Sequence, residues 1–159
     1  MDLLRQRFGL AESCEVTFEM DPGTFDQARL DAFLDAGITR VSVGVQSFDD
    51  ALLEQAGRTH DASEARAAID MLLEAAAQPS NQLACVSVDL IGGLPHQTRE
   101  SWRQSLEYAG SCGAHHVSVY DLQLEPGTAF GARYRPGVSP MPSEEAAADF
   151  FRDASEVLR

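Results

Sequence analysis

Four polar side chains lie at or just beyond the ends of apolar segments, and their types suit a small polar ligand. Glu19, Gln46 and Asp89 each close a hydrophobic run, and Arg58 follows Gln46 by twelve residues. A carboxylate suits an ammonium group, an arginine pairs with a carboxylate through two parallel hydrogen bonds, and amide or carboxylate oxygens accept from hydroxyls. The set predicts a ligand that has an ammonium, a carboxylate and vicinal hydroxyls.

The alternative for each of these side chains is a structural role, in which it satisfies the backbone of a nearby loop. For all four together a ligand site is the stronger interpretation. Polar side chains that converge on one point need hydrogen-bond partners, and a ligand can supply them. Tyr120 closes a further run and is expected to join them.

Two hydrophobic periodicities alternate in the segments that position these residues. Alternation of every second residue predicts strands with one polar face and one helix-covered face, and three- to four-residue spacing predicts helices. Thr24 with Gln27, and Asp61 with Glu64, predict capping boxes. Strands are expected at 15–19, 40–47, 84–91 and 115–123, helices near 1–10, 24–37, 48–57, 61–79, 98–110 and 143–159, and an irregular segment at 131–142.

This order predicts parallel βαβ units, and therefore an α/β fold with the site at the strand ends of a partial (β/α) TIM-like barrel. Four strands do not close a barrel, since the eight-stranded form needs about 250 residues. We therefore expect either an open sheet or a single partial domain, residues 1–159, whose final helix 143–159 leads toward a further region.

Composition excludes several classes of protein. The 159 residues have a formal net charge of -13, which disfavours nucleic acid as a partner. All 12 basic residues are Arg, which excludes Schiff-base lysine chemistry and a P-loop lysine. Cys14, Cys85 and Cys112 have no disulfide or metal-cluster spacing, and the sequence has no recognisable leader or transmembrane run, so a cytoplasmic location, or an organellar one in a eukaryote, is expected.

Several segments resemble the radical SAM family of oxygen-independent coproporphyrinogen III oxidase and the haem chaperone HemW, whose cofactor S-adenosylmethionine has the three groups named above. The resemblance spans nearly the whole chain in the right order, and the Glu-Pro-Gly-Thr segment is closer to the HemW branch. The matching segments are Glu19–Thr24, Gly44–Phe48, Gly57-Arg58-x-His60, Asp89–Pro95 with Gln97-Thr98, and Glu125–Thr128.

The resemblance implies a function in porphyrin or haem metabolism, with haem or a porphyrin as partner. It also implies a [4Fe–4S] cluster and S-adenosylmethionine, which together generate a 5′-deoxyadenosyl radical. Glu19, Gln46, Arg58 and Asp89 would contact S-adenosylmethionine. Gln123 falls where the family contacts this cofactor, but strand parity places its side chain on the other face, which leaves only its backbone. The catalytic residues are unassigned.

The sequence also departs from the family pattern at positions that bear on its function. The family's C-x-x-x-C-x-x-C loop and Gly-Gly-Gly-Thr-Pro loop do not occur here, so no metal ligand is assigned and this chain alone is expected to have little radical activity. Gly92 stands where the family has an aromatic residue and His96 where it has glycine. The free sheet edge of such a truncated core predicts self-association.

Two other readings stay open. One is a metal-dependent lyase or isomerase barrel that uses Glu19, Asp89 and Asp121 as oxygen ligands. The other is a non-catalytic haem-binding module, in which His60 or His96 would be a candidate ligand, although a turn or loop role is the stronger reading for both.

Overall fold

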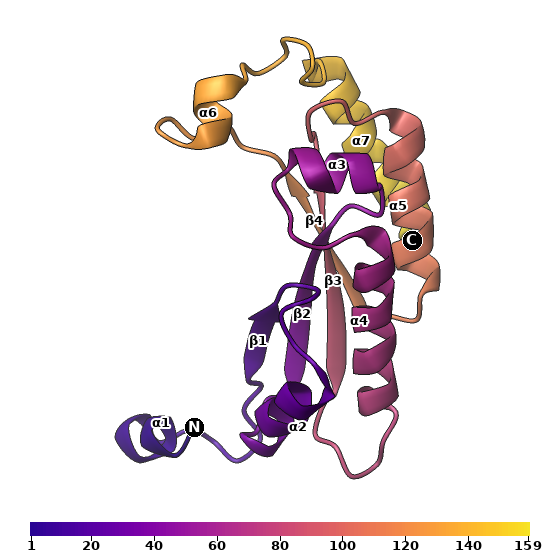
Figure 1. The fold of residues 1–159 in the computed structure, drawn as a ribbon. Helices are drawn as coiled ribbons and strands as arrows, with labels where there is room; N and C mark the ends of the chain where they lie inside the picture. The colour runs from indigo at the N-terminus through magenta and orange to yellow at the C-terminus, as the bar shows by residue number, and fades with distance from the viewer.

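The computed structural model describes residues 1–159 as a four-stranded parallel sheet whose strands follow the chain order (Figure 1). The predicted α/β class is confirmed. Each observed strand lies within about two residues of its predicted range. The strands are β1 (Thr17–Met20), β2 (Arg40–Gln46), β3 (Cys85–Gly92) and β4 (His116–Asp121).

Seven helices connect or flank the strands. Helices α4, α5 and α7 run along one side of the sheet, while α1 and α6 lie away from it at opposite ends of the molecule (Figure 1). They are α1 (Asp2–Phe8), α2 (Gln27–Asp35), α3 (Asp50–Gln55), α4 (Ala62–Ala76), α5 (Arg99–Ser111), α6 (Ala129–Arg133) and α7 (Glu144–Val157).

The two faces of the sheet differ as the alternation predicts. Val41, Val43 and Val45 of β2 are fully buried in one core cluster with side chains of α4 and α5. The other face is polar: the Ser42 hydroxyl contacts both carboxylate oxygens of Asp89 at 2.9 Å, and Ser87 contacts His116 Nδ1 at 2.9 Å. The side with the hydroxyls and carboxylates therefore faces away from the covering helices.

Two details of the helices differ from the sequence prediction. Thr24 does not cap α2, because its hydroxyl donates to the Asp21 carbonyl and the Asp26 side chain accepts from Arg29 N instead. The segment 131–142 is not wholly irregular, because Thr128 caps the short helix α6. The capping box of Asp61 with Glu64 is confirmed.

Helix α7 is fixed to α5 by buried polar contacts. Trp102 Nε1 donates to the Phe150 carbonyl at 2.8 Å, and the fully buried Asp153 carboxylate accepts from both Arg99 and Arg103 at 2.7–2.8 Å. The hydrogen bonds from Arg99, more than the opposing effect of burial, hold the pKa of Asp153 below its usual value. This attachment orders the last helix against the core.

No helix is both long and apolar enough to span a bilayer.

Candidate functional site

Three side chains meet above Gly44, at the end of β2 on the polar face. A methyl group at Gly44 would lie 2.7 Å from Asp21 Oδ1, 2.9 Å from Gln46 Nε2 and 3.5 Å from Arg58 Nη2. The first two distances are shorter than atomic contacts allow, so a larger residue here would force the ends of the Asp21 and Gln46 side chains to shift. We call Asp21, Gly44, Gln46 and Arg58 the Gly44 cluster.

Arg58 reaches this cluster from the turn after α3. Its Nη2 donates to Asp21 Oδ1 and to the Gly44 carbonyl, the latter at 3.1 Å, while Nε and Nη1 have no partner in the protein. Both hydrogens of Nη2 are therefore in use. An arginine binds a carboxylate bidentately through two nitrogens on one edge of the guanidinium. The carboxylate of a ligand can therefore make a single contact with Nη1 or Nε of Arg58, or it must displace Asp21.

Gln46 closes β2 in a strained conformation. Its φ is 69°, and Ser47 N donates to the Val45 carbonyl at 2.9 Å across it, which is a γ-turn with positive φ at its centre. The register with β3 shifts between Val43 and Gln46 at the same place. Gln46 Oε1 is buried without a hydrogen-bond partner. A strained residue with an unpaired buried acceptor is typical of a ligand site.

Glu19 and Asp89 lie on either side of Ser42. Glu19 is the register partner of Ser42 in β1, and Asp89 lies two residues beyond the register partner of Ser42 in β3. The Ser42 hydroxyl holds the Asp89 carboxylate at 2.9 Å, while the side chain of Glu19 is exposed and makes no hydrogen bond. The structure thus places Glu19, Asp89 and the Gly44 cluster on one face.

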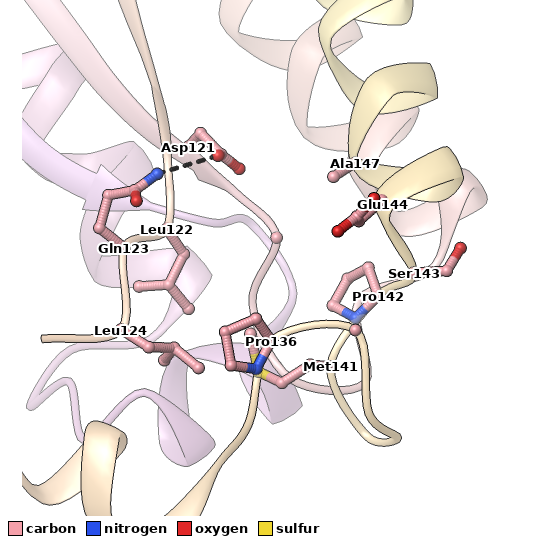
Figure 2. Close-up of a pocket in the computed structure, with 12 residues that line it drawn as sticks. Asp121, Leu122, Gln123, Leu124, Pro136, Met141, Pro142, Ser143, Glu144 and Ala147 are labelled. Carbon is pink, nitrogen blue, oxygen red and sulfur yellow. Dashed lines mark hydrogen bonds between the residues drawn. The ribbon is translucent and has the colours of Figure 1, made fainter. Parts of the chain in front are cut away.

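Two further predicted residues belong to the last strand and the segment after it. Gln123 is exposed beyond β4, where Nε2 donates to Asp121 Oδ2 at 3.1 Å beside a separate hollow of about 200 Å³ (Figure 2). Tyr120 is 57% exposed on the edge strand and makes no hydrogen bond with the cluster. Tyr120 lies two residues after Ser118, the register partner of Asp89, and so shares the face of Asp89; its convergence with Glu19 and Asp89 stays a prediction.

The turn after β3 is held by one buried side chain. Gln97 Oε1 accepts from Gly93 N at 2.6 Å and Leu94 N at 3.2 Å, and Gln97 Nε2 donates to the Ile91 carbonyl at 3.2 Å. His96 in this turn has a φ of 62°, a region that favours glycine. The departure from the family glycine at this position is thus accommodated with backbone strain.

Sequence reasoning missed two residues of this region. The sequence assigns no role to Asp21, and it favours a turn or loop role for His60. In the structure Asp21 is the partner of Arg58, and His60 is buried with Nε2 3.1 Å from the Val45 carbonyl. Burial against β2 also removes His60 as a haem ligand. The only available signal was the Gly57-Arg58-x-His60 spacing, which does not reveal its partner strand.

The alternative of a divalent-metal site is not supported. Glu19, Asp89 and Asp121 do not form a group that could hold a metal ion, and neither do any other His, Cys, Asp or Glu side chains of the chain. The three cysteines are separate thiols. These residues also do not provide a ligand set for an iron–sulfur cluster, which requires several thiolates.

A parallel β/α sheet with helices on one face and polar side chains on the other is the architecture of a (β/α)-barrel-type domain. The chain belongs to the Radical SAM superfamily, whose family model matches residues 2–109. The members of this superfamily use S-adenosylmethionine and a [4Fe–4S] cluster.

Relatives place the chain beside the HemW and coproporphyrinogen oxidase branch. It is 44% identical to "Heme chaperone HemW" of Synechocystis over 96% of this chain and 36% of the relative. It is 39% identical to "Radical S-adenosyl methionine domain-containing protein 1, mitochondrial" of Mus musculus, over 100% of this chain and 35% of the relative. The solved structure of Escherichia coli coproporphyrinogen III oxidase superposes with a TM-score of 0.83 at 25% identity, over 99% of this chain and 35% of that chain. The chain thus spans about a third of the length of the proteins it matches.

Proposed function

We propose that the polar face of this chain binds S-adenosylmethionine, as the partial core domain, residues 1–159, of a radical SAM protein of haem or porphyrin metabolism. The buried, unpaired Oε1 of Gln46 beside Arg58 is the observation on which the proposal chiefly rests. A buried acceptor without a donor costs free energy, and a ligand hydroxyl or amine would remove that cost.

The proposed contacts follow the chemistry of each side chain. Glu19 is exposed at the end of β1 and receives the ammonium group, while Arg58 donates to the ligand carboxylate. Gln46 and Asp89 accept from the vicinal hydroxyls, since Asp89 keeps acceptor capacity beyond its bond to Ser42. Gln123 contributes at most its backbone, because its side chain is engaged by Asp121.

The bound cofactor, with a reduced iron–sulfur cluster, supplies radical chemistry in this superfamily. The residues of this chain would bind and orient it, and the cluster ligands must come from elsewhere. We therefore expect the chain alone to bind S-adenosylmethionine without turnover.

Calorimetric titration of the chain with S-adenosylmethionine tests the proposal. Arg58→Ala is expected to weaken binding by about 1.5–3 kcal/mol, or about 10- to 150-fold in Kd, because a charged hydrogen bond is lost. Gln46→Asn is expected to weaken it as well, since asparagine tolerates positive φ but its amide is shorter. Arg66→Ala is the matched control, because Arg66 stacks on Tyr108 at 4.0 Å and has no contact with the cluster. Absence of binding to the unmodified chain would refute the proposed function.

For the biological role we propose a HemW-like haem chaperone, with the oxidase as the alternative. The support is the 44% identity to a relative with that name, against 25% for the oxidase structure. Titration with hemin, followed in the Soret region, should saturate near one equivalent. A Soret band that survives replacement of His96, the loop histidine, would exclude that residue as ligand, and a lack of saturation would contradict haem binding by this part of the protein.

For the location we propose a reducing compartment, the bacterial cytoplasm or a eukaryotic organelle. The three cysteines are unpaired, and the mouse relative is named as mitochondrial.

A further inference from the structure

The end of β2 needs an external hydrogen-bond donor to keep its shape. The register shift removes the regular ladder partners between Val43 and Gln46, and the Val45 carbonyl closes the γ-turn by accepting from Ser47 N. Such a turn with positive central φ is rare and strained. A residue other than glycine keeps a positive φ only where surrounding contacts stabilise that conformation.

His60 and Arg58 supply the donors from the segment that follows α3. Arg58 Nη2 donates to the Gly44 carbonyl at 3.1 Å, and His60 Nε2 lies 3.1 Å from the carbonyl of Val45, the next residue along the strand. A carbonyl can only accept, so the proton of the His60 ring is on Nε2. His60 is 4% exposed, and its Nδ1 is buried without a partner, so the ring is fixed by this one polar contact and by packing.

The turn that His60 contacts decides where the Gln46 amide points. With φ at 69°, Gln46 Nε2 lies 2.9 Å from the methyl position of Gly44, next to Asp21 and Arg58. Alternation places Gln46 on the same face of β2 as Gly44, and the positive φ at Gln46 then sets the direction in which its side chain leaves the backbone. The placement of the amide thus depends on a turn that His60 stabilises.

We propose that His60 is a positioning residue that holds the strained γ-turn at Val45–Ser47 and thereby aims Gln46 at the ligand. The proposal rests on the proposed function for the identity of the ligand, but the effect on the turn is independent of it. His60 acts through the backbone of β2, since it is buried and its one polar contact is with the Val45 carbonyl.

The test compares His60→Leu, which fills the space without a donor, with His60→Gln, whose amide nitrogen can restore the donor. Backbone amide exchange and the Gln46 side-chain amide resonances are measured by nuclear magnetic resonance on the full chain. In His60→Leu the Ser47 amide should exchange about fivefold faster or more, as expected for one lost hydrogen bond, and the Gln46 amide signals should shift. His60→Gln should return both toward the values of the unmodified chain.

Trp102→Phe is the matched control, because it also deletes a buried side-chain donor to a carbonyl, that of Phe150, in a different part of the core. It should raise exchange near α7 and leave the Gln46 signals in place. If His60→Leu fails to fold, His60→Asn, whose amide is too short to reach the Val45 carbonyl, provides the same comparison. Exchange that rises uniformly in the His60 variants, with unchanged Gln46 signals, would overturn the proposal.

Titration with S-adenosylmethionine separates this inference from the proposed function. If the unmodified chain binds, His60→Leu should weaken binding per folded molecule about fivefold or more, and His60→Gln should recover it. Binding that is unaffected by His60→Leu would overturn the positioning role and leave the proposed function intact. If the unmodified chain does not bind, the proposed function fails, and the exchange data still decide whether His60 holds the turn.

Discussion

The Asp21 carboxylate accepts a hydrogen bond from Arg58 Nη2, the nitrogen that also donates to the Gly44 carbonyl. A carboxylate of the protein therefore occupies part of the guanidinium that is proposed to receive the carboxylate of the ligand. The two groups are 37 residues apart in sequence, and about half of the Asp21 side chain is exposed. This arrangement makes Asp21 both the partner that orients Arg58 and a competitor for it.

Replacing Asp21 should therefore change affinity in a ligand-dependent way. Asp21→Asn removes a negative charge next to the ligand carboxylate and frees a donor of Arg58, so S-adenosylmethionine should bind up to about fivefold more tightly, the size expected of an exposed ion pair. Methylthioadenosine, which has no carboxylate, should bind equally well to both proteins in the same calorimetric experiment. An equal gain for both ligands, or a loss for S-adenosylmethionine, would show that Asp21 does not compete.

Filling the space at Gly44 should disrupt the site with little effect elsewhere. In Gly44→Ala the methyl group would meet Asp21 and Gln46 at less than 3 Å, so both side chains must move. We expect affinity for S-adenosylmethionine to fall about tenfold, the equivalent of one misplaced charged hydrogen bond. Gly110→Ala in α5 is the control, since its methyl meets only the end of the Leu158 side chain at 3.4 Å. Equal affinities of the two variants would contradict the role of the glycine.

The stability that the attachment of α7 to α5 provides should depend on pH. The pKa of Asp153 is lowered in the folded protein, chiefly by hydrogen bonds from Arg99, so the folded state binds this proton less readily than the unfolded state. The resulting stability is complete above the ordinary carboxyl pKa of about 4 and is lost as the pH falls toward and through the lower folded value.

Asp153→Asn should lower the melting temperature by several degrees at neutral pH, since three charge-assisted contacts to Arg99 and Arg103 are weakened. Urea unfolding at a series of pH values between about 3 and 7 checks the sign. The unmodified chain should lose more stability on acidification than the variant. Parallel curves for the two proteins would show that Asp153 is not the group responsible.

Both edges of the sheet are unpaired, and this predicts association between copies of the chain. β1 and β4 each have one strand neighbour, and Tyr120 on β4 is 57% exposed. Sedimentation velocity should show mass that increases with concentration, and Tyr120→Lys should restore the monomer. Phe8→Lys on α1 is the comparison, because Phe8 is 74% exposed away from the edges. A monomer at all concentrations would refute the prediction.

Most of the fold was accessible from periodicity. The four strands were predicted within about two residues because alternation of Val with Ser or Gly is a property of a few neighbouring positions. The capping box of Asp61 followed from Glu64 three positions later. Thr24 was a wrong choice because its hydroxyl has a nearer acceptor in the Asp21 carbonyl. Helix α6 was not predicted, because a helix this short shows no hydrophobic periodicity.

The sequence by itself determined which residue types stand at the strand ends, and hence that a polar face exists opposite the hydrophobic one. Tertiary structure alone decided that Asp21 pairs with Arg58, that Gln46 sits at positive φ with an unpaired oxygen, and that His60 is buried against Val45. The physical reason is the sequence separation of the interacting residues. Alternation and capping are set by residues a few positions apart, whereas these contacts depend on strand register and on the path of a later turn, which exist only when the sheet has formed.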